Sequence, residues 1–90
     1  MSQAQRIVEV TNKRGLHARA SAKFVTLAAT LPAAVEVEKD GARVCGTSIM
    51  GLMMLGAAKG DTIVISATGD GAQEAVEALT ALVEARFNEE

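Results

Sequence analysis

Three segments of the chain alternate apolar and polar residues with a period of two, which is typical of β-strands with one buried face. These segments are Arg6–Thr11, Val35–Lys39 and Asp61–Thr68. The residues expected to face the core are Val8, Val10, Val35, Val37, Ile63, Ile65 and Ala67. Strands of this kind bury one face and leave the other in water, as in antiparallel sheets.

A hairpin is predicted at Asp40–Gly41, because glycine tolerates the positive φ that a two-residue turn requires. Ala42–Gly46 then continues as a fourth strand, with Ala42 and Val44 on one face. A second turn is expected at Gly69–Gly71, between the last strand and the segment that follows it.

Three segments have a helical pattern instead. The first runs from Ala18 to about Leu31, with Pro32 just past its end. The second is the short, methionine-rich segment Ser48–Leu55. The third runs from Ala72 to about Phe87. The expected core-facing residues of the first and third helices are Phe24, Leu27, Ala28 and Leu31, and Ala72, Ala75, Val76, Leu79, Leu82, Val83 and Phe87.

The predicted order is therefore β-α-β-β-α-β-α. Strands with one apolar face, combined with amphipathic helices, favour an open-faced α/β sandwich in which three helices cover one face of a four-stranded antiparallel sheet. A length of 90 residues suits one domain, so residues 1–90 are expected to form a single domain.

Composition narrows the class of protein. The chain is 49% hydrophobic and 22% charged, which is ordinary for a globular protein. No apolar run is long enough to span a bilayer, the N-terminus lacks the pattern of a secretory signal, and Cys45 has no partner for an internal disulfide. These features predict a cytoplasmic protein without membrane contact. A net charge of −2 and only two aromatic residues argue against nucleic-acid binding.

Candidate chemistry is concentrated at His17, the only histidine, where a flexible loop enters the first predicted helix. The first N–H groups of a helix lack internal partners, and this end attracts phosphate. A neutral imidazole is a nucleophile, and Arg19 is close enough in sequence to contact a phosphoryl oxygen. A lone histidine here is also compatible with a simple helix cap. The chain has no cluster with metal-ligand spacing, so neither a metal nor another cofactor is expected.

The segment GLHARASAKFV, at Gly15–Val25, resembles the active-site segment of the HPr family, the histidine phosphocarriers of the bacterial phosphotransferase system. The segment GTSIMGLMMLGAAKGDTIVISATG, at Gly46–Gly69, resembles the second half of the same family. The resemblance covers nearly the whole chain, and the family's β-α-β-β-α-β-α sandwich agrees with the predicted order. It implies a stoichiometric phosphocarrier rather than an enzyme with its own turnover.

The resemblance also implies residue roles. His17 is expected to accept a phosphoryl group on Nδ1 from phosphorylated enzyme I and to pass it to an enzyme IIA protein or domain. Arg19 is expected to stabilise that group, together with the helix start at Ala18, while Gly15 allows a tight loop. Ser48 matches a regulatory serine that a serine kinase modifies, although it also suits a helix N-cap.

The resemblance implies that Ile49, Met50, Met53 and Met54 form the surface that partner proteins bind, and flexible methionines suit several partners. Helical periodicity places Leu52 and Leu55 toward the core instead. Ala20 departs from the family pattern, because many sugar-pathway relatives have proline there, and Thr47 stands where many serine-regulated relatives have lysine. The sequence therefore leaves both the sugar branch and the nitrogen-related branch open. A small-molecule-binding or protein-interaction module without phosphotransfer is the alternative, and a monomer is expected.

Overall fold

The computed structural model describes residues 2–89, and its elements follow the predicted order. The strands are β1 (Gln3–Glu9), β2 (Ala34–Lys39), β3 (Ala42–Cys45) and β4 (Thr62–Thr68). The helices are α1 (Ala18–Ala29), α2 (Ile49–Met54) and α3 (Ala72–Glu84), followed by the short 3₁₀ turn η1 (Arg86–Asn88). No helix among these residues is long and apolar enough to cross a membrane.

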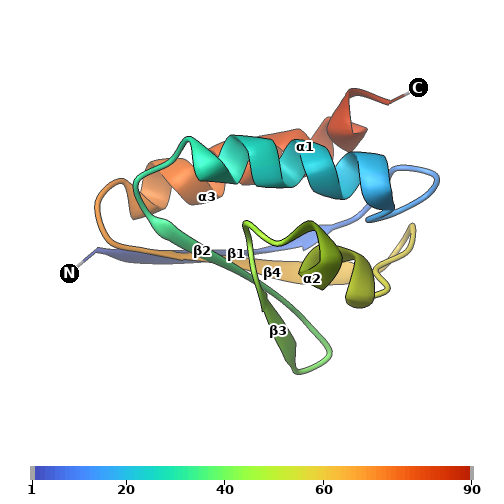
Figure 1. Cartoon of the computed structure of the whole chain (residues 1–90), viewed down its shortest axis with the longest axis horizontal. Helices are drawn as coiled ribbons and strands as arrows, with labels where there is room; N and C mark the ends of the chain where they lie inside the picture. Colours follow the sequence, from blue (N-terminus) through green and yellow to red (C-terminus); the bar gives the residue numbers. More distant parts are fainter. Residues whose placement is uncertain (1, 90) are drawn as a thin grey trace.

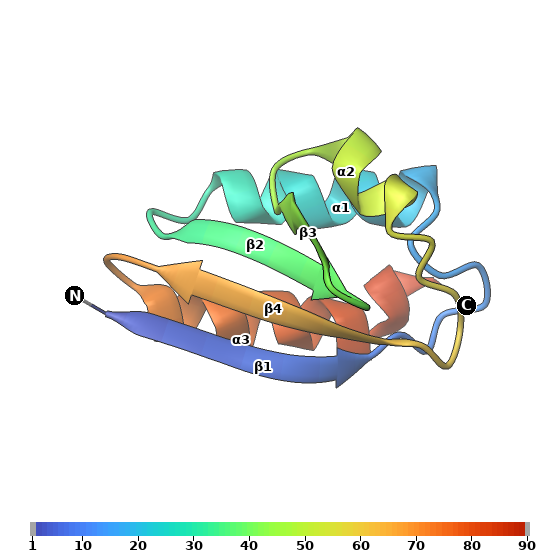
Figure 2. The ribbon, with the colours of Figure 1, turned by 90° about the horizontal axis from the view of Figure 1, so that it is seen from below.

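The strands form one antiparallel sheet in the order β1-β4-β2-β3. Helices α1 and α3 run side by side across one face of this sheet, and α2 lies against α1 next to β3 (Figure 1). The described elements leave the other face of the sheet uncovered, as the view from below shows (Figure 2). The open-faced sandwich predicted from the sequence is confirmed.

The core lies between the sheet and the two long helices. The seven strand residues expected to face inward are all buried, and Phe24 and Phe87 are the largest fully buried side chains. The apolar faces of α1 and α3 also pack here, with Leu27, Leu31 and Leu82 half-buried at the margin. The period-two and helical patterns therefore identified the buried faces correctly. The exception is Ala42, which is exposed because the β2–β3 hairpin extends beyond the helices (Figure 1).

The turn at Asp40–Gly41 has the predicted form, with φ of 51° and 86° at its two central residues. Strand β1 occupies Gln3–Glu9, so it starts earlier and ends earlier than the alternation suggested. Val10 is nevertheless buried beyond the strand end, because its N–H donates to Asp61 O and its carbonyl accepts from Gly60 N–H. Helix α1 ends at Ala29, where the Thr30 hydroxyl donates to a carbonyl of the last turn.

The prediction that the last helix continues to Phe87 is wrong. Helix α3 ends at Glu84, and Arg86, Phe87 and Asn88 have φ of 57°, 54° and 61°. Phe87 is fully buried within this left-handed turn. The amine of Lys23 on α1 donates to Phe87 O at 2.6 Å. These contacts offset the cost of left-handed geometry in residues other than glycine and bring the C-terminal segment to the start of α1.

Candidate functional site

His17 is the N-cap of α1, as the sequence predicted. Its backbone is extended, with φ −75° and ψ −179°, and its carbonyl accepts from the N–H of Ser21 at 2.8 Å. Ring atom Nδ1 accepts from the backbone N–H of Arg19 at 3.2 Å. The imidazole is therefore oriented toward the free amides at the start of the helix, where an anion is favoured.

The loop before His17 packs closely against the backbone of Ala57 and Ala58. Gly15 has φ +63°, and a Cβ at this position would clash with Ala57 O and lie 2.8 Å from the Cα of Ala58. The next residue, Leu16, is buried and donates its N–H to the same Ala57 O at 2.9 Å. A residue without a side chain is thus required for the loop to approach so closely.

Glu89 contacts the other ring nitrogen of His17. Its Oε2 lies 2.7 Å from Nε2, and 16% of the histidine side chain is exposed. The carboxylate's second oxygen, Oε1, accepts from Asn12 Nδ2 at 3.2 Å, and the same nitrogen donates to Gly15 O at 2.8 Å. The sequence reasoning identified neither Glu89 nor Asn12 as a site residue. Glu89 lies 72 residues from His17 in sequence, and no local pattern indicates such a contact.

The charge of Glu89 is stabilised by its neighbours. Burial by itself raises the pKa of this carboxyl group. Hydrogen bonds from His17 and Asn12, with the charges of His17 and Lys23, outweigh burial and hold the pKa below its ordinary value of 4.5. Glu89 is therefore a carboxylate at neutral pH.

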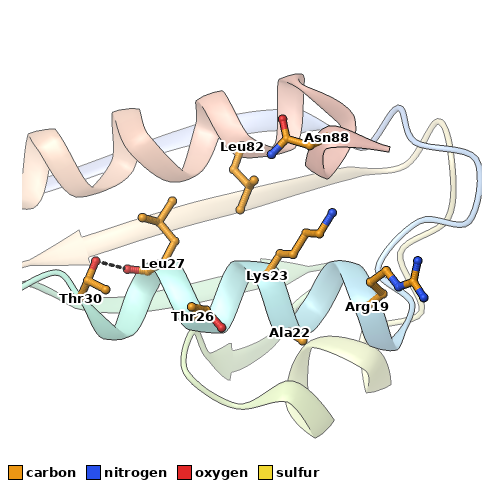
Figure 3. Close-up of a pocket in the computed structure, with 8 residues that line it drawn as sticks. All are labelled: Arg19, Ala22, Lys23, Thr26, Leu27, Thr30, Leu82 and Asn88. Carbon is orange, nitrogen blue, oxygen red and sulfur yellow. Dashed lines mark hydrogen bonds between the residues drawn. The ribbon is translucent and has the colours of Figure 1, made fainter. Parts of the chain in front are cut away.

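Arg19 and Ala18 are exposed at the first turn of α1. The guanidinium of Arg19 forms no hydrogen bond or ion pair within residues 2–89. It stands at one end of an open groove of about 630 Å³ between α1 and the C-terminal elements (Figure 3). The groove is lined by Arg19, Ala22, Lys23, Thr26, Leu27, Thr30, Leu82 and Asn88. The unpaired guanidinium is free to contact an anion placed at the start of the helix.

Ser48 is the N-cap of α2, and its Oγ accepts from the N–H of Gly51 at 3.0 Å. Leu52 and Leu55 are buried, as predicted. The remaining apolar residues form an exposed surface, named here the methionine patch. Its members and their exposed fractions are Ile49 40%, Met50 68%, Met53 40% and Met54 79%. Because α2 packs against α1, the patch lies on the element next to the helix that carries His17.

No group of three or more metal-ligating side chains occurs in the described part of the chain. The site therefore consists of one nucleophilic ring, free amides, a guanidinium and a carboxylate. This set of groups can accept an anionic group on Nδ1 and neutralise its charge.

Comparison with known proteins points to the same chemistry. The family model described as the HPr component phosphorylation site of the phosphotransferase system matches residues 4–85. Phosphocarrier protein HPr of Neisseria meningitidis serogroup A is 50% identical over 82 residues, which cover 91% of this chain and 92% of that protein. Phosphocarrier protein NPr of Shewanella violacea is 37% identical over 89 residues, covering 99% and 98% of the two chains. The crystal structure of HPr-C-His from Thermoanaerobacter tengcongensis superposes with a TM-score of 0.89 at 43% identity, covering 100% of this chain and 99% of that chain.

Proposed function

The chain belongs to the HPr family and is a phosphocarrier of the phosphotransferase system, and we propose that His17 carries the phosphoryl group on Nδ1. The observation that carries this proposal is the orientation of the ring, whose Nδ1 faces the N–H of Arg19 at the start of α1. The alternative of a binding module without phosphotransfer is set aside by the family membership.

In the proposed reaction, the lone pair of Nδ1 attacks phosphorus while the bond between phosphorus and the donor atom breaks. The Arg19 N–H then loses its ring acceptor and becomes available to a phosphoryl oxygen, together with the backbone amide of Ala18, the first residue of α1. The guanidinium of Arg19 supplies charged donors. Gly15 contributes by letting the loop approach Ala57, which fixes where the ring stands.

The partners are proteins of the phosphotransferase system. In this proposal phosphorylated enzyme I is the donor, and an enzyme IIA protein of the sugar or the nitrogen-related branch is the acceptor. Both bind in turn to the methionine patch (Ile49, Met50, Met53 and Met54), whose flexible side chains suit more than one partner. The chain acts as a stoichiometric carrier without its own turnover.

Regulation is proposed at Ser48. A phosphate added there by a serine kinase would place charge beside the methionine patch, where desolvating it on docking is unfavourable. We further propose that residues 1–90 act as one monomeric domain in the cytoplasm. One continuous core and the exposed free thiol of Cys45, which suits a reducing compartment, support this part of the proposal.

The test uses purified protein with enzyme I and phosphoenolpyruvate, followed by intact-mass measurement. We expect a gain of one phosphate that is labile in acid and stable in base, and its loss in His17→Ala. A phosphate retained by His17→Ala would overturn the assignment of His17. Acid-stable phosphate would indicate a hydroxyl acceptor instead.

A further inference from the structure

We propose that Glu89, oriented by Asn12, is a positioning residue that holds the imidazole of His17 in the tautomer with its proton on Nε2. The inference rests on the proposed role of His17 and adds two residues to the site. It explains how Nδ1, rather than Nε2, is presented as the nucleophile.

The tautomer follows from the partners of the two ring nitrogens. A carboxylate accepts hydrogen bonds and donates none, so the short 2.7 Å contact from Nε2 to Glu89 Oε2 requires a proton on Nε2. On the other side, the N–H of Arg19 donates to Nδ1, which requires a lone pair there. Both contacts select the same tautomer, and its free lone pair is on the nitrogen that faces the helix amides.

Asn12 connects the carboxylate to the loop. It is buried, with 1% of its surface exposed, and Nδ2 donates to both Glu89 Oε1 and Gly15 O. Both partners are acceptors, so this orientation of the amide is favoured over the reversed one, in which oxygen would face oxygen. Asn12 therefore fixes Glu89 relative to the same loop that carries His17.

Contacts of the residues just before Glu89 determine where Glu89 lies. Phe87 is fully buried, and Lys23 on α1 donates to its carbonyl at 2.6 Å. Helix α3 ends on the side of the molecule where α1 starts, and the left-handed turn at Arg86–Asn88 follows there, so the C-terminal segment lies near the start of α1 (Figures 1 and 2). Glu89 follows the buried Phe87 by two residues and contacts the imidazole of His17.

The carboxylate also has a role during transfer. When the bond from Nδ1 to phosphorus forms and the bond to the donor atom breaks, the proton on Nε2 stays, so the ring becomes a positively charged phosphoimidazolium. Glu89 then forms an ion pair with the proton-bearing Nε2. When the phosphoryl group leaves for the acceptor, the electron pair of the bond returns to Nδ1 and the ring is neutral again. Carboxylates that orient a metal-ligating imidazole through its other ring nitrogen are worth roughly 10–100-fold, and we expect an effect at the lower end of that range for the orientation of His17.

The test compares Glu89→Ala and Glu89→Gln with the wild type, and uses Glu84→Ala as the control that removes a carboxylate exposed on α3. Nitrogen NMR shifts of the neutral His17 ring report the tautomer, and phosphorylation by enzyme I reports kcat and KM. We expect one dominant tautomer in the wild type and in Glu84→Ala. In Glu89→Ala we expect a mixture of the two His17 tautomers and a kcat about 10-fold lower, with KM unchanged. Glu89→Gln retains an acceptor for Nε2–H, so it keeps the tautomer but recovers only part of the rate.

An unchanged tautomer ratio and unchanged kcat in Glu89→Ala would overturn the positioning role while leaving the assignment of His17 intact. Failure of the proposed function is separately visible, because the wild type would then take up no phosphate or His17→Ala would still take it up. A rise in KM alone would assign Glu89 to docking and also overturn the inference.

Discussion

The two ring nitrogens of His17 have different partners, and this difference fits a residue that must both hold its orientation and react. The Nε2 contact to Glu89 is short, at 2.7 Å, and involves a charged acceptor. The Nδ1 contact to the Arg19 N–H is longer, at 3.2 Å, and is exposed. In the proposed transfer, the phosphoryl group therefore displaces the weaker bond at Nδ1 while the stronger bond at Nε2 keeps the ring in place.

Arg19→Ala is expected to slow phosphoryl transfer roughly 100-fold, the effect typical of removing one donor to a developing negative charge. The fold should be unaffected, because the Arg19 side chain is exposed and its guanidinium forms no hydrogen bond or ion pair among residues 2–89. Rapid-quench kinetics with enzyme I measures the rate, and thermal unfolding checks the fold. Arg19→Lys is the matched variant, because it keeps the positive charge but loses the planar guanidinium that can donate two parallel hydrogen bonds. Equal rates for wild type and Arg19→Ala would contradict the role.

Site residues differed in how well the sequence alone identified them. Loop-to-helix boundaries in the sequence place His17, Arg19 and Ser48 at helix starts, and the structure confirms these positions. The resemblance to the HPr family, rather than a local pattern, suggested the regulatory role of Ser48 and favoured His17 as the phosphoryl acceptor over a simple cap. Glu89 and Asn12 were missed because the contact between Glu89 and His17 spans 72 residues. A buried amide and a carboxylate near the chain end have no spacing that distinguishes them from ordinary polar residues.

Helix α2 carries the cap at Ser48 and the proposed docking surface, and two substitutions at Ser48 separate these two roles. Ser48→Ala removes the acceptor for the Gly51 N–H and should lower the free energy of unfolding by about 1 kcal/mol without changing enzyme I affinity. Ser48→Asp keeps a good cap and adds charge beside the methionine patch, so stability should hold while affinity falls. Urea unfolding and calorimetric titration measure the two effects. Equal enzyme I affinity for Ser48→Asp and wild type would leave Ser48 with the cap role alone.

The loop between β1 and α1 depends on Gly15. Gly15→Ala should lower the free energy of unfolding by about 2–4 kcal/mol, because left-handed strain adds to the clash with Ala57 O. Gly41→Ala is the control, since φ is +86° there but no atom lies within 4 Å of the added Cβ. Backbone strain alone should lower the free energy of unfolding of Gly41→Ala by about 1 kcal/mol. Chemical denaturation of the two variants measures the difference, and equal losses would show that the close approach to Ala57 has no effect.

The boundaries of elements were predicted less well than their faces. Buried positions in β2 and β4 alternate with a period of two, and this alternation does not depend on where a strand begins or ends. The residues facing the core were therefore predicted correctly even where the strand ends, as in β1, were not. The end of α3 was wrong because Phe87 continues the apolar stripe of a right-handed helix. No glycine marks the left-handed residues Arg86–Asn88, so the usual signal for ending a helix is missing.

The whole site depends on a topology that the hydrophobic pattern does not specify. Placing β4 between β1 and β2 brings the loop after β1 next to the loop before β4, where Leu16 bonds to Ala57. Helix α3 then runs back over the sheet and delivers the C-terminal turn to the start of α1 (Figure 2). Strand alternation gave the fold class, whereas the strand order that assembles the site results from packing between distant segments.

This assembly makes the stability of the whole molecule depend on pH through Glu89, whose pKa is held below its ordinary value of 4.5 by His17, Asn12 and Lys23 despite burial. In the window between the lowered value and 4.5, the unfolded chain binds a proton that the native state does not, so stability rises with pH. The contribution is complete above pH 4.5 and is lost as the pH falls through the native pKa.

Glu89→Gln removes this titration and keeps the size of the side chain. Urea unfolding measures the free energy of unfolding of both proteins from pH 7 down to about pH 3. Above the ordinary carboxyl pKa the wild type should be more stable than the variant, and below it the difference in free energy between the two proteins should shrink. The other carboxylates titrate in both proteins, so the difference isolates Glu89. Glu84→Gln serves as the matched control, because it makes the same substitution at an exposed carboxylate of α3. A difference in free energy of unfolding between wild type and Glu89→Gln that stays constant across the pH range would contradict this prediction. It would mean that the contacts with His17 and Asn12 do not stabilise the carboxylate in the native state.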